Sequence, residues 1–196
     1  MGFERGERQA KRTKKALIQA FSQLLHDKNY NDITVNDITN LADAGRSTFY
    51  RYFKSKADVL VEMHEGVFGR FILNHSSASD WLSDEPSSEL VEFFRKFQKS
   101  GPVQLSLTYT LGSDIDYLTR EIINLLNEKI EESLHSCFSE SDSNIPFAVL
   151  AQAISGTYSQ VLLSWVSKHQ VLSVEKIAEY IHRITRSVIQ EAIGQS

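Results

Sequence analysis

The sequence has little of what disulfide-stabilised or strand-rich proteins use. It contains one cysteine, Cys137, so an intrachain disulfide is excluded and a reducing, cytoplasmic location is expected. Only three prolines occur, and each lies at a break between helical patterns. There is no run of alternating β-branched residues and no Asn-Gly hairpin signal. Together these absences predict an all-α fold.

Charge is distributed unevenly along the chain. Residues 1–56 contain 11 Lys and Arg against 6 Asp and Glu, whereas residues 57–196 contain 10 against 19. A basic end on an acidic body is expected when one end of a protein meets nucleic-acid phosphates, although a solvated basic helix gives the same pattern. The charged stretch Gly2–Lys15 has no apolar core segment, so a signal peptide is not expected.

Apolar residues recur at helical spacing in the N-terminal part of the chain. We expect helices over about Gln9–His26, after a capping box that begins at Thr34, over about Arg46–Tyr52, and from Ser55 onward, with a turn at Asp43–Gly45. The residues of the second and third helices that should face the core are Val35, Ile38, Leu41, Ala42, Phe49 and Phe53.

The remaining chain shows the pattern of further helices joined by short loops. These helices are expected over about Ser88–Lys99, Val103–Leu111, Ile115–Phe138, Pro146–Lys168 and Val174–Ile193. The Ser- and Asp-rich stretches Ser76–Ser88 and Ser139–Asn144 are expected to be loops.

Two helices joined by a turn of three to four residues, the second short and polar, are typical of a helix-turn-helix. The second helix of such a motif enters the major groove of double-stranded DNA. Arg46 can bond guanine or phosphate, and hydroxyls at the helix start can bond phosphate beside the backbone amides. The candidate DNA-contacting residues are Arg46, Ser47, Thr48, Tyr50, Arg51, Tyr52 and Lys56.

The run Arg46–Lys56, together with Ile33-Thr34-Val35, Asp37-Ile38 and Ala42, resembles the TetR family of bacterial regulators. The resemblance implies a helix-turn-helix domain over residues 1–56 and a helical ligand-binding and dimerisation domain over residues 57–196. It implies a regulator, more often a repressor, that binds operator DNA as a homodimer and responds to an unknown small-molecule effector.

The resemblance also assigns roles to single residues. Thr34 matches the residue that caps the second helix and touches phosphate, and Lys56 matches a lysine at the start of the fourth helix. Two positions depart from the family's pattern. Asp43 stands where the turn often carries Gly, and Gly45 stands where Ser or Thr often caps the recognition helix.

The stretch Ser143–Ser167 contains no charged residue, which raises the alternative of a membrane span. Its many polar residues favour a buried helix instead, so no membrane partner is expected. The last helix also has a wide apolar stripe, and two such helices predict a two-fold interface, where TetR-like proteins dimerise. The expected interface residues are Ile154, Tyr158, Val161, Trp165, Ile177, Ile181, Ile184 and Val188.

Aromatic residues of the body are candidates for an effector pocket, with ordinary core as the alternative for each. The pocket candidates are Phe68, Phe71, Trp81, Phe97, Tyr109, Tyr117, Tyr158 and Trp165. No metal-ligand cluster, cofactor motif or catalytic motif is present, so no metal, no cofactor and no enzyme activity are expected. Two alternatives are a TetR-like co-activator or cell-division factor that acts through a protein partner, and an all-helical enzyme or carrier.

Overall fold

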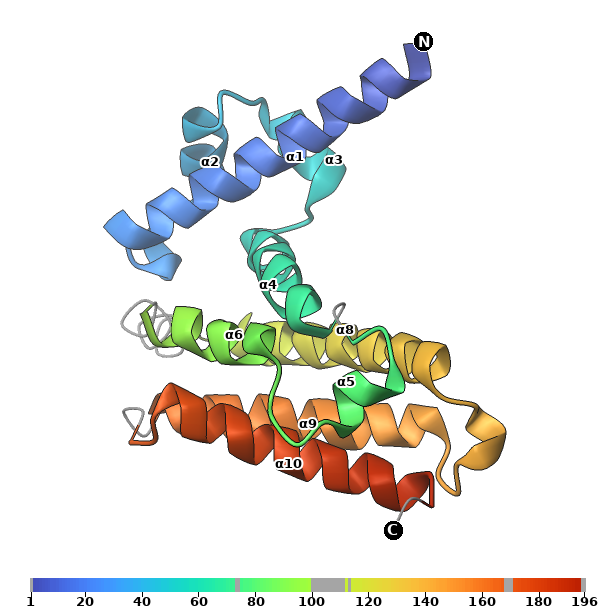
Figure 1. The fold of residues 1–196 in the computed structure, drawn as a ribbon. Coiled ribbons are helices and arrows are strands. Elements are labelled where there is room, and N and C mark those ends of the chain that lie inside the picture. Colours follow the sequence, from blue (N-terminus) through green and yellow to red (C-terminus); the bar gives the residue numbers. More distant parts are fainter. Residues whose placement is uncertain (1, 73–74, 100–111, 113, 168–170, 195–196) are drawn as a thin grey trace. The chain divides into compact units, whose positions relative to one another are not determined.

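The computed structural model describes residues 2–72, 75–99, 112, 114–167 and 171–194. Every regular element in these ranges is a helix, which confirms the predicted all-α fold (Figure 1). None of the described helices combines the length and the apolar character that crossing a membrane requires.

The chain divides into two compact units. The first unit contains Met1–His64 and the beginning of α8 (Asp114–Cys137) up to Thr119, and the second contains the other described residues. Helix α4 (Lys56–Ile72) also contributes residues to both units. The predicted domain boundary between residues 56 and 57 falls at the first turn of α4 and stays a prediction.

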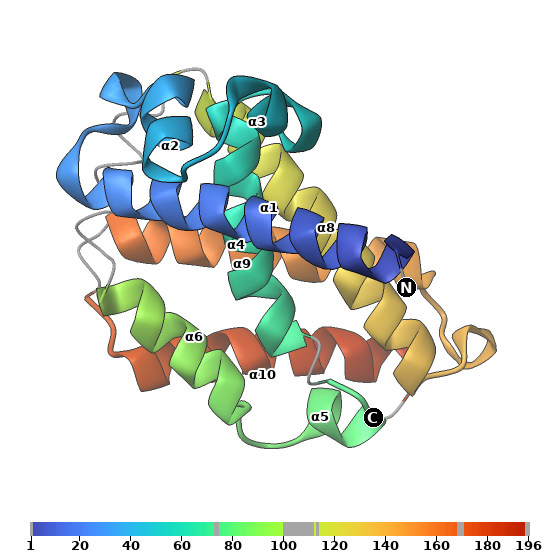
Figure 2. The same ribbon diagram turned by 90° about the horizontal axis from the view of Figure 1, so that it is seen from above.

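The first unit is built from α1 (Gly2–Asp27), the 3-10 turn η1 (Tyr30–Asp32), α2 (Val35–Leu41), α3 (Arg46–Tyr52) and the start of α4. Helix α1 packs against α2, and α2 packs against α3 (Figure 2). Large side chains at helical spacing bury one stripe of α1 and close a core with the shorter elements. The buried members of this core include Leu17, Phe21, Tyr30, Ile33, Ile38, Phe49, Phe53 and Leu60.

Two details of this unit differ from the sequence-based expectation. Helix α1 begins at Gly2 rather than near Gln9, so its basic N-terminal segment is helical. Leu41, which was expected to face the core, is 45% exposed, and that prediction was wrong. Leu41 is the last residue of α2, so it lies at the edge of the packed face.

The second unit contains α5 (Ala78–Leu82), α6 (Ser88–Lys99), most of α8, the 3-10 turn η2 (Glu140–Asp142), α9 (Phe147–Ser167) and α10 (Val174–Ala192). Helix α10 packs along α9 and also contacts α5 and α6 (Figure 1). The predicted helices after residue 87 match α6, α8, α9 and α10 to within a few residues at each end. The predicted helix Val103–Leu111 lies outside the described residues.

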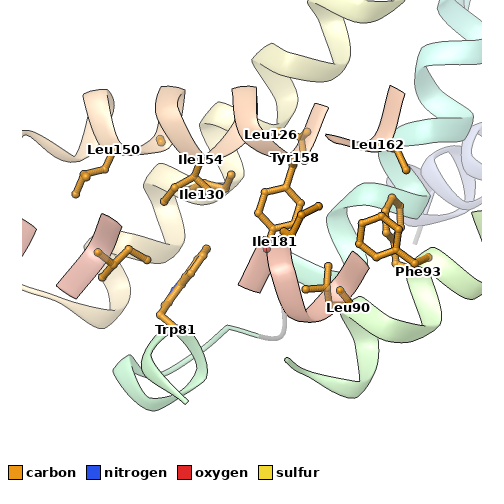
Figure 3. Packing of buried hydrophobic residues seen from close by; sticks show 14 of the residues in the cluster. Trp81, Leu90, Phe93, Leu126, Ile130, Leu150, Ile154, Tyr158, Leu162 and Ile181 are labelled. Atoms are coloured by element: carbon orange, nitrogen blue, oxygen red, sulfur yellow. The ribbon is translucent and has the colours of Figure 1, made fainter. Parts of the chain in front are cut away.

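The core of the second unit is rich in aromatic side chains, which interleave with leucines and isoleucines of α8, α9 and α10 (Figure 3). Trp81 of α5 is buried there, and its indole N–H donates to Ser133 Oγ at 3.1 Å. Ser133 in turn donates to the carbonyl of His75 at 2.8 Å, which satisfies the polar groups that burial would otherwise leave unpaired.

The expectation that Ser76–Ser88 is only a loop was wrong, because the stretch contains α5. Asp80 accepts hydrogen bonds from the backbone N–H groups of Ser76 and Ser77 and from the Ser77 hydroxyl, at 2.8–2.9 Å. Serine and aspartate are common in turns, but they also cap helices, so composition alone does not separate the two.

Candidate nucleic-acid interface

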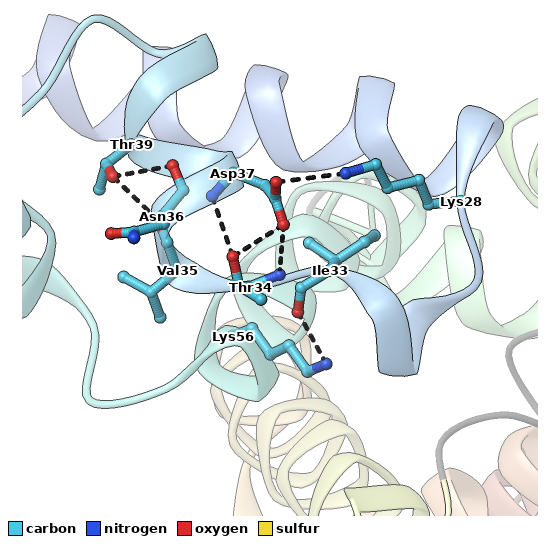
Figure 4. A network of polar contacts seen from close by, with 8 residues as sticks. All are labelled: Lys28, Ile33, Thr34, Val35, Asn36, Asp37, Thr39 and Lys56. Atoms are coloured by element: carbon cyan, nitrogen blue, oxygen red, sulfur yellow. Dashed lines mark hydrogen bonds and ion pairs between the residues drawn. The ribbon is translucent and has the colours of Figure 1, made fainter.

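The predicted capping box at the start of α2 is present and is shown in Figure 4. The Asp37 N–H donates to Thr34 Oγ1 at 3.2 Å, and the Thr34 N–H donates to Asp37 Oδ2 at 2.8 Å. The bond from the Thr34 N–H, a second bond from the Thr34 hydroxyl to Asp37 Oδ2 at 2.7 Å, and then the ion pair with Lys28 at 3.2 Å lower the pKa of Asp37 from 3.8 to about 2. The start of α2 is therefore fixed by residues within one turn of each other, and Thr34 itself is exposed.

The turn between α2 and α3 depends on one unusual backbone conformation. Asp43 has a φ of 49°, in the left-handed region that glycine adopts without cost. This conformation lets the Ala44 N–H donate back to the Thr39 carbonyl at 2.9 Å, which closes the end of α2. The glycine that the family often carries here is thus explained by geometry, and aspartate is one of the residues that tolerates it.

Helix α3 begins immediately after Gly45, as predicted, and runs over the predicted range Arg46–Tyr52. Gly45 is the N-cap and supplies no side-chain hydrogen bond, in agreement with the missing hydroxyl. Phe49 is fully buried and packs against Phe53 at 5.6 Å between ring centroids. These two rings hold one face of α3 in the core, as expected.

The opposite face of α3 is open. The cationic and hydroxyl side chains Arg46, Ser47 and Arg51 are exposed, and Tyr50 is 51% exposed. Thr48 and Tyr52 are half-buried. The structure therefore brings these six candidates together on one short helix, in positions from which DNA can be reached, although their contacts with DNA stay predictions.

Lys56 occupies a different environment from the other candidates. Its ammonium donates to the carbonyls of Tyr30 at 2.6 Å and Ile33 at 3.0 Å, and it lies 4.2 Å from the centroid of the Tyr30 ring. Figure 4 shows the bond to Ile33. Burial lowers the pKa of Lys56, while Asp114 and Asp32 act in the opposite direction. Its donors are directed into the protein, whereas the sequence-based expectation directed them to phosphate.

Helix α1 adds exposed positive charge to the same unit. The side chains of Lys11, Arg12 and Lys15 are exposed, whereas Lys14 forms an ion pair with Glu62 at 2.6 Å. Because α1 begins at Gly2, these cations lie beyond its first two turns, where the helix dipole does not disfavour them. The arrangement is consistent with a sequence-independent contact to phosphate beside the recognition helix.

The candidate pocket residues do not come together in the structure. Trp81 and Tyr158 are packed inside the core of the second unit, and Phe97 packs against that core. Tyr117 belongs to the first unit, where its hydroxyl donates to Asp58 Oδ1 at 2.7 Å. Trp165 is buried but borders an open groove between α9 and α10. The shared aromatic pocket therefore stays a prediction for Trp81, Phe97, Tyr117 and Tyr158; the side chains of Phe68, Phe71 and Tyr109 lie outside the described residues.

The expected dimer residues differ in exposure, and their contact with a partner stays a prediction. Five of them are buried in the core of the second unit, where the apolar stripes of α9 and α10 pack on the rest of that unit. These five are Ile154, Tyr158, Trp165, Ile177 and Ile181. Val161 and Val188 are half-buried, and Ile184 is 46% exposed. Trp165, Ile177 and Ile181 do border the groove, but only at its floor.

Sequence reasoning missed a group of residues that ties the first unit together. The Tyr30 hydroxyl donates to Asp114 Oδ2 at 2.7 Å, across 84 positions of sequence. Asp58 accepts from Tyr117 with one oxygen, and from the N–H groups of Lys54 and Ser55 with the other. No periodic or local pattern connects residues so far apart, so only the folded structure could reveal them.

A capped helix, a tight turn and a short helix with one face buried and a cationic face exposed define the first unit as a helix-turn-helix DNA-binding domain. Residues 14–63 match the family model described as bacterial regulatory proteins, tetR family. This match covers about a quarter of the chain, so the helix-turn-helix segment is of the TetR type, and a solved TetR regulator shares the fold of the whole chain.

Three relatives show how far the similarity extends. The chain is 32% identical to the HTH-type dhaKLM operon transcriptional activator DhaS of Lactococcus lactis over 72 residues. These residues are 37% of this chain and 38% of that protein. It is 23% identical over 164 residues to the fatty acid metabolism regulator protein of Bacillus subtilis, covering 79% and 84%. A solved TetR transcriptional regulator from Streptococcus agalactiae is 27% identical with a TM-score of 0.55, covering 92% and 97%. The match to DhaS therefore spans only 38% of that relative's length, whereas the structural likeness extends through both units.

Proposed function

We propose that this protein regulates transcription by binding double-stranded operator DNA through α3. The observation that carries this proposal is the division of α3 into two faces, with Phe49 in the core and Arg46, Ser47 and Arg51 exposed. A helix held in this way can enter the major groove without losing its packing. Purified protein should bind DNA from upstream of its own gene with an affinity that falls steeply as salt rises. Binding that is insensitive to salt and to sequence would contradict the proposal.

We further propose that the protein is a ligand-responsive repressor and that it acts by binding rather than by catalysis. The family assignment and the relatives named as regulators support this, and the DhaS relative is named an activator. A reporter gene behind the selected operator should therefore be expressed less when the protein is present. Higher expression would make the protein an activator and reverse the sign of the proposal.

The proposed effector can be identified by the small molecule that remains bound to the purified protein. Native mass spectrometry of protein purified without added ligand should show a small molecule that dissociates on unfolding. Adding back that molecule should change the affinity for operator DNA, because an effector acts only through different affinities for two states of the protein. Consumption of the molecule would instead favour the enzyme alternative, and DNA binding without sequence preference would favour a factor that acts through a protein partner.

We propose that the outer surface of α9 and α10 joins two copies of the chain, in the cytoplasm where the operator lies. An open groove of about 680 Å³ runs between these helices, and its lining is mainly apolar. Val171, Tyr180 and Ile184 border the groove and are exposed. Because α9 carries no charged residue, a second copy can cover this surface without burying an unpaired charge on that helix.

The oligomeric state tests this arrangement directly. Ile184→Glu places a carboxylate at the groove and should convert a dimer to a monomer in light scattering coupled to gel filtration. Arg183→Glu is the matched control, since Arg183 is the neighbouring exposed residue of α10 and does not border the groove. A wild-type monomer, or equal effects of the two variants, would contradict the assignment of this surface.

A further inference from the structure

Four side chains of the first unit form two tyrosine–aspartate pairs, each joined by one hydrogen bond. Tyr30, in the η1 turn, donates to Asp114 of α8 at 2.7 Å, and Tyr117 of α8 donates to Asp58 of α4 at 2.7 Å. Asp114 and Tyr117 are three residues apart on α8 and therefore lie on one face of its first turns. We call these four residues the tyrosine–aspartate clamp.

Each pair of the clamp also contacts a segment that flanks the helix-turn-helix. Asp58 uses its second carboxylate oxygen to accept from the Lys54 and Ser55 N–H groups at 2.6 and 2.8 Å, which caps the start of α4 directly after the recognition helix. Tyr30 is 1% exposed, and its carbonyl accepts from the Lys56 ammonium at 2.6 Å.

The Lys56 ammonium extends this connection to α2. It also donates to the Ile33 carbonyl at 3.0 Å, and Ile33 immediately precedes the cap residue Thr34. Figure 4 shows Lys56 below the Ile33–Thr34 segment, with its ammonium directed at the backbone. Lys56 therefore links the start of α4 to the segment before α2, and Asp114 links the start of α8 to η1.

We propose that the tyrosine–aspartate clamp and Lys56 are positioning residues for DNA binding, and that they fix the helix-turn-helix to the first turns of α8. This inference rests on the proposed function and assigns its residues a new role. Lys56 acts as an internal donor and not as a phosphate contact.

Two substitutions weaken the same hydrogen bond from opposite ends. Tyr30→Phe removes the donor and keeps the ring beside Lys56, and Asp114→Asn removes the charge of the acceptor. Asp116→Asn is the matched control, since Asp116 is an exposed acid in the same first turn of α8. The probe is a short duplex selected by the wild-type protein from a randomised library, and affinity is measured where circular dichroism shows every variant folded.

We expect Tyr30→Phe and Asp114→Asn each to weaken binding by about tenfold, the value of one charge-assisted hydrogen bond. The double variant should bind no more weakly than the weaker single variant, because both changes act on one contact. Asp116→Asn should leave affinity unchanged or raise it slightly by removing a negative charge. A residue that only stabilises the fold would lower the melting temperature and leave the affinity of the folded variant intact, and that result would overturn the proposal.

The salt dependence tests the role of Lys56. Arg51→Ala, which removes an exposed cation of α3, should lower the slope of log affinity against log salt by about one. Lys56→Gln should weaken binding with less than half of that change in slope. An equal change in slope for the two variants would return Lys56 to the phosphate contacts and contradict the positioning role.

Hydrogen exchange separates this inference from the proposed function. If the wild-type protein selects no duplex, the proposed function fails, but the clamp can still be measured. The amides of Val35–Leu41 should exchange about tenfold faster in Tyr30→Phe and Asp114→Asn than in wild type, and should not change in Asp116→Asn. Unchanged exchange in the first two variants overturns the clamp whatever the outcome with DNA.

Discussion

The two units differ in where their chemically informative side chains lie. In the first unit, the candidates Arg46, Ser47 and Arg51 are exposed on a helix that short-range interactions define. In the second unit, the aromatic candidates Trp81 and Tyr158 are packed in the core. Large aromatic residues in the body therefore report on packing, whereas cations and hydroxyls on a short, capped helix report on a surface that can meet a partner.

Loss of a core aromatic should show the largest difference between the units. Trp81→Ala removes a buried indole and leaves a cavity, so the free energy of unfolding should fall by about 3–5 kcal/mol in urea titrations. Trp81→Phe, which retains most of the apolar surface, should cost less. A near-neutral Trp81→Ala would mean that the indole borders an open pocket after all.

Loss of a recognition-helix cation should have the opposite pattern. Arg46→Ala should change the sequence preference in randomised-site selection, with discrimination at one base pair reduced by about 1–3 kcal/mol. The unfolding free energy should change by less than about 0.5 kcal/mol, because Arg46 is exposed. Arg183→Ala, on α10, is the control and should leave the preferred sequence unaltered. An identical preference for Arg46→Ala and wild type would remove Arg46 from the base contacts.

The α2 cap should contribute a smaller, local effect. Thr34→Ala should destabilise α2 by about 1 kcal/mol, measured as faster hydrogen exchange at the amides of Val35–Leu41. Thr34→Ser keeps the hydroxyl and should keep most of the protection. Equal exchange in the alanine and serine variants would show that the hydroxyl does not cap the helix.

The pH dependence gives an independent measure of the same cap. Because the folded-state pKa of Asp37 is lowered from 3.8 to about 2, its carboxylate favours the folded state above the unfolded pKa. That contribution is lost as the pH falls from about 4 toward 2. Protection of α2 should therefore decline over this range in wild type and decline less in Asp37→Asn.

The smallest expected effect is at the turn of the helix-turn-helix. Asp43→Gly relieves the left-handed conformation at φ 49° and should stabilise the first unit by at most about 1 kcal/mol. Asp43→Ala keeps the Cβ and should be neutral or destabilising in the same urea titration. A stabilising alanine would show that the backbone at Asp43 is not strained.

The sequence predicted most accurately what neighbouring residues decide. The range of α3 and the capping box at Thr34 follow from turn and cap preferences within a few positions, and both are confirmed. The same argument failed at Leu41, which the helical periodicity places on the core face but which is 45% exposed. Periodicity identifies the apolar face of a helix, but it does not show which residues of that face are packed against other elements.

Contacts between distant segments were beyond the reach of sequence reasoning. Tyr117 was a pocket candidate because it is aromatic, yet its hydroxyl donates a hydrogen bond to Asp58, 59 positions away. Tyr158 and Ile181 carry the surplus apolar surface that indicated an interface, and the structure buries that surface within one chain. A wide apolar stripe is equally suited to a partner or to the chain's own helices, so tertiary packing decides between them.

The N-cap of the recognition helix leaves this regulator open to evolutionary change. Gly45 already has the extended backbone of a capping residue, with φ −78° and ψ 153°. A Cβ there would meet only the Ser47 and Thr48 hydroxyl oxygens, at ordinary contact distances of 3.7 and 3.9 Å. A single Gly45→Ser step would thus introduce a hydroxyl beside the DNA-facing residues while retaining the fold. If α3 reads DNA as proposed, position 45 can therefore alter the preferred sequence without disturbing the backbone.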